Sequence, residues 1–371
     1  MDNDTIPFVD LYAQYQTIKS EIDTAIEQVI TSSAFVRGPY VERFEEEFAE
    51  AVEGRFCITC GNGTDALYIA YIALGVRPGD EVIVPAHSWI STAEAVTQAG
   101  GKVVFCDTDA ETYTIDPKRI EEKITPRTVG IVPVHLYGQP SDMDPIMAIA
   151  EKYGLWVVED CAQAHLARYK GQQVGTFGAV GTYSFYPGKN LGAMGDGGAI
   201  ITNDENLALK MTRFARHGGL KKGEHVIEGI NSRLDGLQAA ILSVKLKHLP
   251  KWTKARQEVA SWYARELASL ERLKLPTVAK GREHVWHLYV IQHEHRDDLA
   301  KHLKVNGVST IINYPIALPF LQAYKHFGYT PEDYPIAHAH QSKILSLPIY
   351  PEISNVQMNK VAHSLGTFNP V

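Results

Sequence analysis

The sequence has few cysteines, no long apolar run and no excess of basic residues. Four of its 371 residues are cysteine, which is too few for the disulfide framework of a small secreted domain. No stretch approaches the roughly 18 unbroken apolar residues of a membrane span. The start, MDNDTIPFVD, carries acidic residues where a signal peptide carries basic ones. We therefore expect a cytoplasmic protein without a membrane partner.

The charge balance argues against a nucleic-acid partner. Lys and Arg number 36 against 43 Asp and Glu, so the formal net charge is -7. A nucleic-acid groove needs clustered positive charge to release counterions, and no long Lys/Arg run is present. The 45% hydrophobic and 21% charged residues are typical of a globular protein. Because single cores stop growing at about 250 to 300 residues, we expect one large and one smaller domain.

Between residues 55 and 202, short apolar runs alternate with stretches of helical spacing. The runs are RFCIT, EVIVPA, KVVFCD, VGIVPV, LWVVED, GTYSFY and GAIIT. The intervening stretches include TDALYIAYIALG, WISTAEAVTQAG, DPKRIEEKI and MDPIMAIAEKYG. This alternation predicts a three-layer α/β domain whose mostly parallel sheet is covered by helices on both faces. Ligands of such sheets bind at the carboxyl ends of the strands, so functional motifs are expected there.

The flanking sequence predicts helices before the sheet and a second domain after it. Residues 17–53 are typical of helices broken at the turn Arg37–Tyr40. Residues 234–270 form a long helical pattern interrupted by Pro250. We assign residues 1–245 to an N-terminal helical segment and large domain, and residues 246–371 to a connecting helix and a small α+β domain.

Gly61–Ala66 (GNGTDA) follows one apolar run and opens a helical stretch. Free backbone N–H groups and the helix dipole at such a junction hold a phosphate. The hexapeptide also fits the GxGxxA pattern of a dinucleotide site, with the acidic Asp80 following Gly61 by 19 residues. In a dinucleotide site, however, the acidic residue ends the second strand, whereas Asp80 precedes it. We favour a phosphate cradle over a dinucleotide site or a plain turn.

Two further motifs place an acid and a lysine after predicted strands. Asp160 ends LWVVED, where its side chain and that of Glu159 must point to opposite faces of the sheet. Lys189 follows GTYSFY in a glycine-rich turn. A lysine whose pKa is lowered by partial burial serves as an amine nucleophile. Together with an aspartate that meets a pyridinium nitrogen and a phosphate cradle, it describes a pyridoxal phosphate site.

The order of motifs resembles the DegT/DnrJ/EryC1/StrS family of nucleotide-sugar aminotransferases, which have the aspartate aminotransferase type of fold. The resemblance covers essentially the whole chain. It is carried by FVDLYAQY, GNGTDAL, PVHLYGQPSDMDPI, VVEDCAQAH, SFYPGKNLGAMGDGGAI, GINSRLDGLQAAIL and LSLPIYPEI. Within the family, the segments around Asp160 and Lys189 are most similar to enzymes that aminate carbon 3 of a dTDP-linked 3-keto-6-deoxyhexose.

The resemblance implies a role for each matching position. Lys189 would hold pyridoxal 5'-phosphate as a Schiff base and move the proton, and Asp160 would keep the pyridine nitrogen protonated. The other cofactor contacts that it implies are Gly63, Thr64 and Ser184 at the phosphate, Gln163 at the ring hydroxyl, and Trp89 stacked on the ring. A core tryptophan is the alternative for Trp89.

The family also implies partners. Asn231 would reach the cofactor phosphate of a neighbouring subunit, which predicts a homodimer with shared sites. The substrates would be a nucleotide-linked ketosugar and glutamate, which becomes 2-oxoglutarate, in deoxyaminosugar biosynthesis such as that of lipopolysaccharide O-antigen. Substrate contacts are assigned to His165, Lys221, Lys222 and Tyr314. A structural histidine and a solvated lysine pair are the alternatives, and Phe320 replaces a histidine usual in relatives.

Other readings remain. The pair Cys57 and Cys60 has no second CxxC downstream, and the i,i+2 histidines at 293/295 and 338/340 lack a third ligand, so we assign no metal.

Three alternative functions remain. The first is the same reaction on a UDP-linked 3-keto sugar or a 4-ketosugar. A sugar dehydratase of this fold would have histidine at position 189, and a catalytically idle regulatory protein would be expected to lose Lys189 or Asp160.

Overall fold

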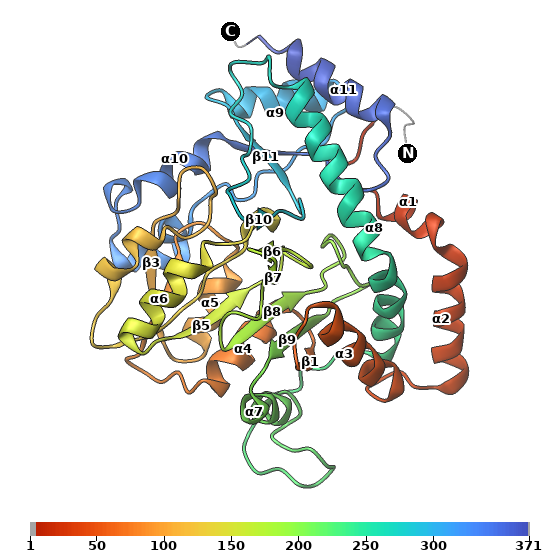
Figure 1. Cartoon of the computed structure of the whole chain (residues 1–371), viewed down its shortest axis with the longest axis vertical. Coiled ribbons are helices and arrows are strands. Elements are labelled where there is room, and N and C mark those ends of the chain that lie inside the picture. The colour runs from red at the N-terminus through yellow and green to blue at the C-terminus, as the bar shows by residue number, and fades with distance from the viewer. Residues whose placement is uncertain (1–4, 370–371) are drawn as a thin grey trace.

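A seven-stranded sheet forms the centre of the larger part of the molecule (Figure 1). The computed structural model describes residues 5–369. The strands lie in the order β1-β9-β8-β5-β4-β2-β3, and β9 alone runs antiparallel to its neighbours. Their bounds are Phe56–Cys60 (β1), Glu81–Pro85 (β2), Lys102–Cys106 (β3), Thr128–Ile131 (β4), Trp156–Asp160 (β5), Val180–Ser184 (β8) and Gly198–Thr202 (β9). Each coincides with one predicted apolar run, so the mostly parallel sheet is confirmed.

Helices cover both faces of this sheet, as the alternating pattern predicts. Gly63–Ala73 (α4), Ser91–Gln98 (α5) and Glu205–Ala215 (α7) pack on one face. Pro39–Ala51 (α3), Met143–Tyr153 (α6) and the first half of Gly236–Glu266 (α8) pack on the other. The molecule therefore has the three-layer α/β arrangement of a fold type I aminotransferase.

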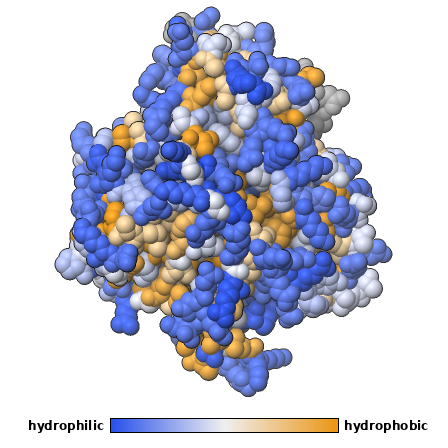
Figure 2. Space-filling model, viewed as in Figure 1, coloured by the Kyte–Doolittle hydropathy of each residue, from blue (hydrophilic) through white to orange (hydrophobic). Residues whose placement is uncertain are grey.

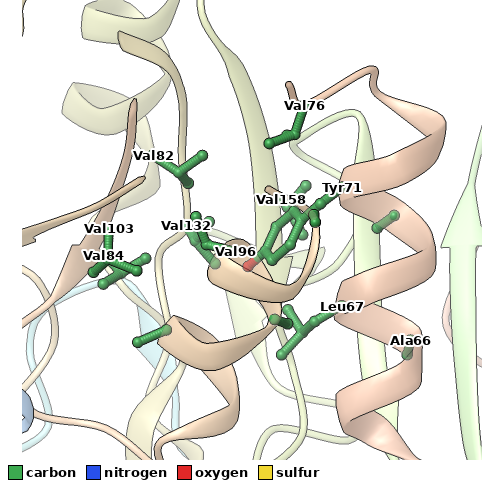
Figure 3. Close-up of a cluster of buried hydrophobic side chains, with 14 of the residues drawn as sticks. Ala66, Leu67, Tyr71, Val76, Val82, Val84, Val96, Val103, Val132 and Val158 are labelled. Carbon is green, nitrogen blue, oxygen red and sulfur yellow. The ribbon is translucent and has the colours of Figure 1, made fainter. Parts of the chain in front are cut away.

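The core under α4 shows how the helical spacing positions the site (Figure 3). Leu67 and Tyr71 lie one turn apart on α4 and point at the sheet. They meet apolar side chains from several strands and connections, among them Val82, Val132 and Val158. Burying each such side chain contributes about 1.5–3 kcal/mol. This packing fixes the N-terminus of α4 at the carboxyl edge of the sheet.

Two predicted helical features differ in the structure. DPKRIEEKI forms two 3-10 turns, Pro117–Arg119 (η1) and Glu121–Lys123 (η2), instead of a helix. The Asp116 side chain accepts from the N–H of Lys118 where η1 begins, and the backbone is extended again at Ile124. Helix α8, in contrast, continues through Pro250. Buried side chains on both sides of Pro250 hold the helix against the rest of the molecule.

The N-terminal helices are Leu11–Thr17 (α1), Lys19–Ser32 (α2) and α3. The predicted break before α3 is confirmed, with Arg37 and Gly38 at φ of 58° and 84°.

The C-terminal part is built on a two-stranded antiparallel sheet, Tyr289–Gln292 (β11) and Ile344–Leu347 (β12). The second half of α8 packs on it together with Arg296–Val305 (α9) and Asn355–Gly366 (α11). The predicted domain boundary at residue 245 falls inside α8 and stays a prediction. The remaining elements are Arg168–Tyr169 (β6), Gln172–Gln173 (β7), Arg282–Glu283 (β10), Pro335–Lys343 (α10), and the 3-10 turns Leu136–Gly138 (η3), Leu318–Phe320 (η4), Gln322–Phe327 (η5) and Pro331–Asp333 (η6).

No helix within residues 5–369 is both long and apolar enough to cross a membrane.

Candidate active site

A cavity of about 610 Å³ lies at the carboxyl ends of the parallel strands. One part of its lining, here called the motif wall, consists of residues at or shortly after the carboxyl ends of β1, β2, β5 and β8: Gly63, Thr64, Trp89, Asp160, Gln163, Ser184 and Lys189. The other part, here called the dispersed wall, comes from separate stretches of the chain and includes Phe8, Arg256, His287, Tyr314 and Ile349. The structure therefore brings every predicted cofactor residue except Asn231 into one cavity.

Lys189 lies in the turn that follows β8. Its backbone N–H donates to the carbonyl of Tyr186 (2.8 Å), which closes this turn. Burial lowers the pKa of the Lys189 amine from 10.5 to about 8, while the negative charge of Asp160 acts in the opposite direction. An amine with a pKa near 8 is partly unprotonated at neutral pH, so it can act as a nucleophile and transfer protons.

Asp160 ends β5 and is 6% exposed. Its Oδ2 accepts a hydrogen bond from the Thr92 hydroxyl (2.9 Å), and its Oδ1 accepts one from the N–H of Ala162 (3.1 Å). Burial raises the pKa of this carboxyl, and the two hydrogen bonds and Lys189 act against that rise. A cationic ring nitrogen beside Asp160 would stabilise the carboxylate, as a protonated pyridine requires.

Glu159, the neighbouring carboxylate, points to the opposite face as predicted. It accepts hydrogen bonds from the N–H groups of Gly175 (2.7 Å), Phe177 (2.8 Å) and Gly178 (2.8 Å). His135 Nε2 lies 3.1 Å from it, and His135 Nδ1 accepts from the Ser141 N–H (2.9 Å). The imidazole proton is therefore on Nε2 and donates to Glu159.

Together with Cys161, this buried pair forms the only group of three or more His, Cys, Asp or Glu side chains within residues 5–369 whose ligand atoms lie close enough together to hold a metal ion. The ligand atoms of His135, Glu159 and Cys161 lie within 4.8 Å of one another. Both imidazole nitrogens and both carboxylate oxygens are already engaged in hydrogen bonds inside the protein. We therefore interpret the group as a structural anchor for the loop after β7.

The start of α4 forms the cradle expected from GNGTDA. The Asn62 side chain caps the helix by accepting from the Asp65 N–H (2.8 Å). A Cβ added to Gly63 would lie 2.7 Å from the Ser184 Cβ, so only glycine allows the helix start to approach the end of β8. The Thr64 hydroxyl lies 2.7 Å from that of Ser91. Backbone N–H groups and hydroxyls thus gather where a phosphate would bind.

The alternative dinucleotide site is excluded by topology. Asp80 lies in the turn before β2, where its side chain accepts from the Arg77 N–H (2.8 Å). This turn is at the amino ends of the strands, opposite the cavity. Asp80 therefore cannot contact a ribose held by the motif wall.

Gln163 connects the two walls. Its Oε1 accepts from the Tyr137 N–H (2.6 Å) and its Nε2 donates to the Tyr314 hydroxyl (2.9 Å). Trp89 is 56% exposed and its ring centroid lies 5.4 Å from that of Tyr314. An exposed tryptophan in a cavity wall is not a core residue, so its ring is available to a bound ligand.

The fit to pyridoxal phosphate rests on these three observations together. The glycine cradle suits a phosphate, the buried Asp160 suits a pyridinium nitrogen, and Lys189 carries an amine of lowered pKa. All three line the same cavity.

His165 does not line the cavity. It is 0% exposed and packs among Phe48, Tyr183 and Phe185, with ring centroids 5.6–6.4 Å away. Burial lowers its pKa to about 3, and the charge of Lys189 adds to this. Both of its ring nitrogens are buried and make no hydrogen bond within residues 5–369. The structure therefore establishes neither the predicted substrate contact nor a hydrogen-bonded structural histidine, and both stay predictions.

Asn231, Lys221 and Lys222 lie in the segment between α7 and α8, which projects from the large domain (Figure 1). All three are exposed and none lines the cavity of its own chain. Figure 2 shows hydrophobic residues at the end of this projection, where Leu220, Val226 and Ile227 are exposed. Contacts of this segment with a partner subunit stay a prediction.

Phe320, which replaces the histidine usual in relatives, also lies outside the cavity lining. It packs on the rings of His338 (5.3 Å between centroids) and Tyr334 (6.4 Å).

Sequence reasoning missed most of the dispersed wall. Phe8, Arg256 and Ile349 belong to the N-terminal segment, to α8 and to the segment after β12. Phe8 and Ile349 lie in the motifs FVDLYAQY and LSLPIYPEI, whereas Arg256 lies in none of the motifs. Spacing in the sequence assigns none of the three to the cavity, because their proximity arises only when the C-terminal part packs against the sheet.

Comparison with known proteins gives the same assignment. The DegT/DnrJ/EryC1/StrS aminotransferase family matches residues 16–366. The dTDP-3-amino-3,4,6-trideoxy-alpha-D-glucose transaminase of Streptomyces venezuelae is 41% identical, over 96% of this chain and 94% of that protein. The UDP-N-acetyl-3-dehydro-alpha-D-glucosamine 3-aminotransferase of Acidithiobacillus ferrooxidans is 42% identical, over 97% of each.

A solved structure shows the same likeness. The crystal structure of DesV from S. venezuelae in complex with a ketimine intermediate superposes with a TM-score of 0.96 at 41% identity, covering 98% of both chains. The cofactor of these aminotransferases is pyridoxal phosphate, which alternates with its pyridoxamine form. With its cradle, acid and lysine arranged around one cavity, the chain belongs to the DegT/DnrJ/EryC1/StrS aminotransferase family and is a pyridoxal phosphate-dependent sugar aminotransferase.

Proposed function

We propose that this sugar aminotransferase transfers the amino group of glutamate to carbon 3 of a dTDP-linked 3-keto-6-deoxyhexose. The observation that carries the proposal is that Lys189 and Asp160 line one cavity beside a glycine cradle. The choice of nucleotide and carbon is supported by the S. venezuelae relative, whose name specifies a dTDP-3-aminosugar.

Pyridoxal phosphate, when bound, supplies a ring that accepts the electrons of a carbanion. Asp160 keeps the ring nitrogen protonated through a charged hydrogen bond, and Thr92 and Ala162 hold its carboxylate in place. Lys189 would hold the cofactor through its amine and, when free, would remove or add the proton at the substrate carbon that bears the nitrogen. Trp89 and Gln163 orient the ring and its hydroxyl.

The second candidate is the same reaction on a UDP-linked 3-keto sugar. The A. ferrooxidans relative, which is named for such a substrate, is as similar as the dTDP enzyme. Neither of these two relatives is named for a 4-ketosugar. A dehydratase would be expected to carry histidine at position 189, and this chain keeps the lysine.

The absorbance of the purified protein tests the proposal. The cofactor bound to Lys189 should give a visible band that disappears with glutamate and returns with a suitable ketosugar. Adding dTDP- and UDP-linked 3-keto and 4-keto sugars separately identifies the acceptor by which one restores the band. A Lys189→Ala control should lack the glutamate-dependent change. A wild-type band unaffected by glutamate would contradict the proposed donor.

We also propose a cytoplasmic homodimer with shared active sites. The exposed Asn231 lies in the projecting segment and does not line the cavity of its own chain. In a dimer this side chain would be free to enter the cavity of the partner subunit. Mixing Lys189→Ala with Asn231→Ala chains should restore part of the activity, because one cavity of a mixed dimer is intact. Absence of recovery in a mixture proven to exchange subunits would argue against sharing. Lipopolysaccharide O-antigen as the destination of the product stays a prediction.

A further inference from the structure

Arg256 is a buried cation in the dispersed wall of the cavity. It lies on α8, is 4% exposed and lines the same cavity as Lys189. Its Nη1 donates to the carbonyl oxygens of Ile349 (2.8 Å), Trp286 (3.2 Å) and His287 (3.4 Å). One guanidinium nitrogen thus ties α8 to the C-terminal part of the molecule.

The other nitrogens of Arg256 have no partner among the described residues. A guanidinium carries five N–H donors, yet within residues 5–369 neither Nε nor Nη2 makes a hydrogen bond. Arg256 forms no ion pair with a carboxylate in the same range, although the charge of Glu352 acts on it from farther away. Buried cations are normally paired, and Nε and Nη2 present the parallel donors that match a carboxylate.

The location of Arg256 suits a substrate anion. Among the Lys and Arg side chains of residues 5–369, only Lys189 and Arg256 line the cavity. Lys189 is taken up by the cofactor, and the cradle at Gly63 provides for its phosphate. His287 contacts both segments: its Nδ1 is 3.2 Å from the Oδ1 of Asn190, the residue after Lys189, and its carbonyl accepts from Arg256 Nη1.

We propose that Arg256 binds a carboxylate of the amino donor through Nε and Nη2. The proposal rests on the proposed function, because it assumes an amino acid donor at Lys189. A carboxylate fits better than the sugar diphosphate. One guanidinium matches one carboxylate, whereas a diphosphate spreads its charge over two phosphoryl groups and no further Lys or Arg of the described chain lines the cavity.

The test measures binding of glutarate, which has the two carboxylates of glutamate but no amine to transfer. Calorimetry on the cofactor-loaded protein should show glutarate binding to the wild type. Arg256→Gln should raise the dissociation constant about 10- to 100-fold, as expected for a lost charge-assisted pair. Arg256→Lys keeps the positive charge but not the two parallel N–H donors, so its dissociation constant should lie between those of the wild type and Arg256→Gln. Binding of dTDP or UDP should be unchanged in both variants.

Lys245→Gln is the matched control. Lys245 is also a buried cation of α8, 4% exposed, but it donates to the Gly192 carbonyl (2.7 Å) and does not line the cavity. Its replacement should leave the glutarate dissociation constant within about twofold. An equal loss in Lys245→Gln and Arg256→Gln would overturn the proposal by showing a general effect of α8.

Other outcomes are equally decisive. Glutarate binding that is absent in the wild type or unchanged in Arg256→Gln would overturn the proposal, as would weakened nucleotide binding alone. If Arg256→Gln does not fold, the comparison of Arg256→Lys with the wild type carries the test. Loss of the wild-type absorbance band with glutamate is measured separately, so failure of the proposed function and failure of the Arg256 assignment are distinguishable.

Discussion

The two walls of the cavity differ in how the chain builds them. The motif wall comes from short connections that leave parallel strands at one edge of the sheet, so each residue is placed by its own strand. The dispersed wall comes from an N-terminal segment, a long helix and loops of the C-terminal part, so its geometry depends on packing across the molecule. The first wall carries the chemistry common to pyridoxal phosphate enzymes. The second includes Arg256, for which we propose a contact with the amino donor.

The largest effect is expected from a substitution of Asp160, the acidic residue of the motif wall. Asp160→Asn keeps the shape of the side chain but removes the charge that, in the proposed role of Asp160, keeps the ring nitrogen of the cofactor protonated. We expect the rate of band loss with glutamate to fall about 10²- to 10³-fold, the usual cost of removing one electrostatic group from a reacting centre. Stopped-flow absorbance measures this rate.

Glu159→Gln is the control for this substitution. Glu159 is the adjacent carboxylate, but it holds three N–H groups of the loop on the other face of the sheet. Its replacement should lower the melting temperature of the protein but leave the rate of band loss with glutamate nearly unchanged. If Asp160→Asn and Glu159→Gln slow the reaction equally, the assignment of Asp160 to the ring nitrogen is wrong.

The second prediction uses the pKa of Lys189, which burial lowers to about 8. Below this pH the amine is protonated and cannot attack the cofactor aldehyde. The rate at which the apoprotein binds the cofactor covalently should therefore rise about tenfold per pH unit up to pH 8 and then level off. If Lys189 had the pKa of an ordinary lysine, the rate of covalent binding would keep rising toward pH 10.5.

Asp160 sharpens this measurement. Its negative charge raises the pKa of Lys189 against the effect of burial, so Asp160→Asn should move the plateau of the rate to lower pH. A plateau that moves to higher pH would contradict the electrostatic coupling inside the motif wall.

How far the sequence predicts the molecule follows the same division. Gly63, Asp160 and Lys189 could be assigned because each motif directly follows a strand, and parallel strands end at one edge. Arg256 could not, because one arginine in a 31-residue helix resembles any solvated charge until α8 packs beside the cavity. His165 lies outside the cavity lining although it is close in sequence to Asp160, because closeness in sequence does not fix the face on which a side chain lies.

The third prediction tests the close approach within the motif wall. In Gly63→Ala the new Cβ would lie 2.7 Å from the Ser184 Cβ, so the helix start and the end of β8 must separate. We expect the cofactor dissociation constant to rise about tenfold, because hydrogen bonds to the phosphate weaken with distance. Equilibrium dialysis of the cofactor measures it.

Gly188→Ala is the matched control, since Gly188 also lines the cavity but its new Cβ would approach no atom closer than 3.6 Å. Cofactor affinity should change little in this variant. An equal loss at both glycines would mean that added bulk in the cavity, rather than the cradle at Gly63, determines affinity.

The smallest expected effect concerns the junction of the two walls. Tyr314→Phe removes the hydroxyl that accepts from Gln163 Nε2 (2.9 Å) but leaves the ring beside Trp89. A neutral hydrogen bond contributes about 0.5–1.5 kcal/mol net, so the rate of band recovery with the ketosugar should fall about two- to tenfold.

Tyr113→Phe is the control. It breaks a similar hydrogen bond away from the cavity lining, from Gln292 Nε2 to the Tyr113 hydroxyl at 2.9 Å. Both variants should lose comparable stability in urea. Only Tyr314→Phe should slow band recovery, because its partner Gln163 lines the cofactor cavity and Gln292, the partner of Tyr113, does not. Equal rates of band recovery in the two variants would show that the Tyr314 hydroxyl has no role in catalysis.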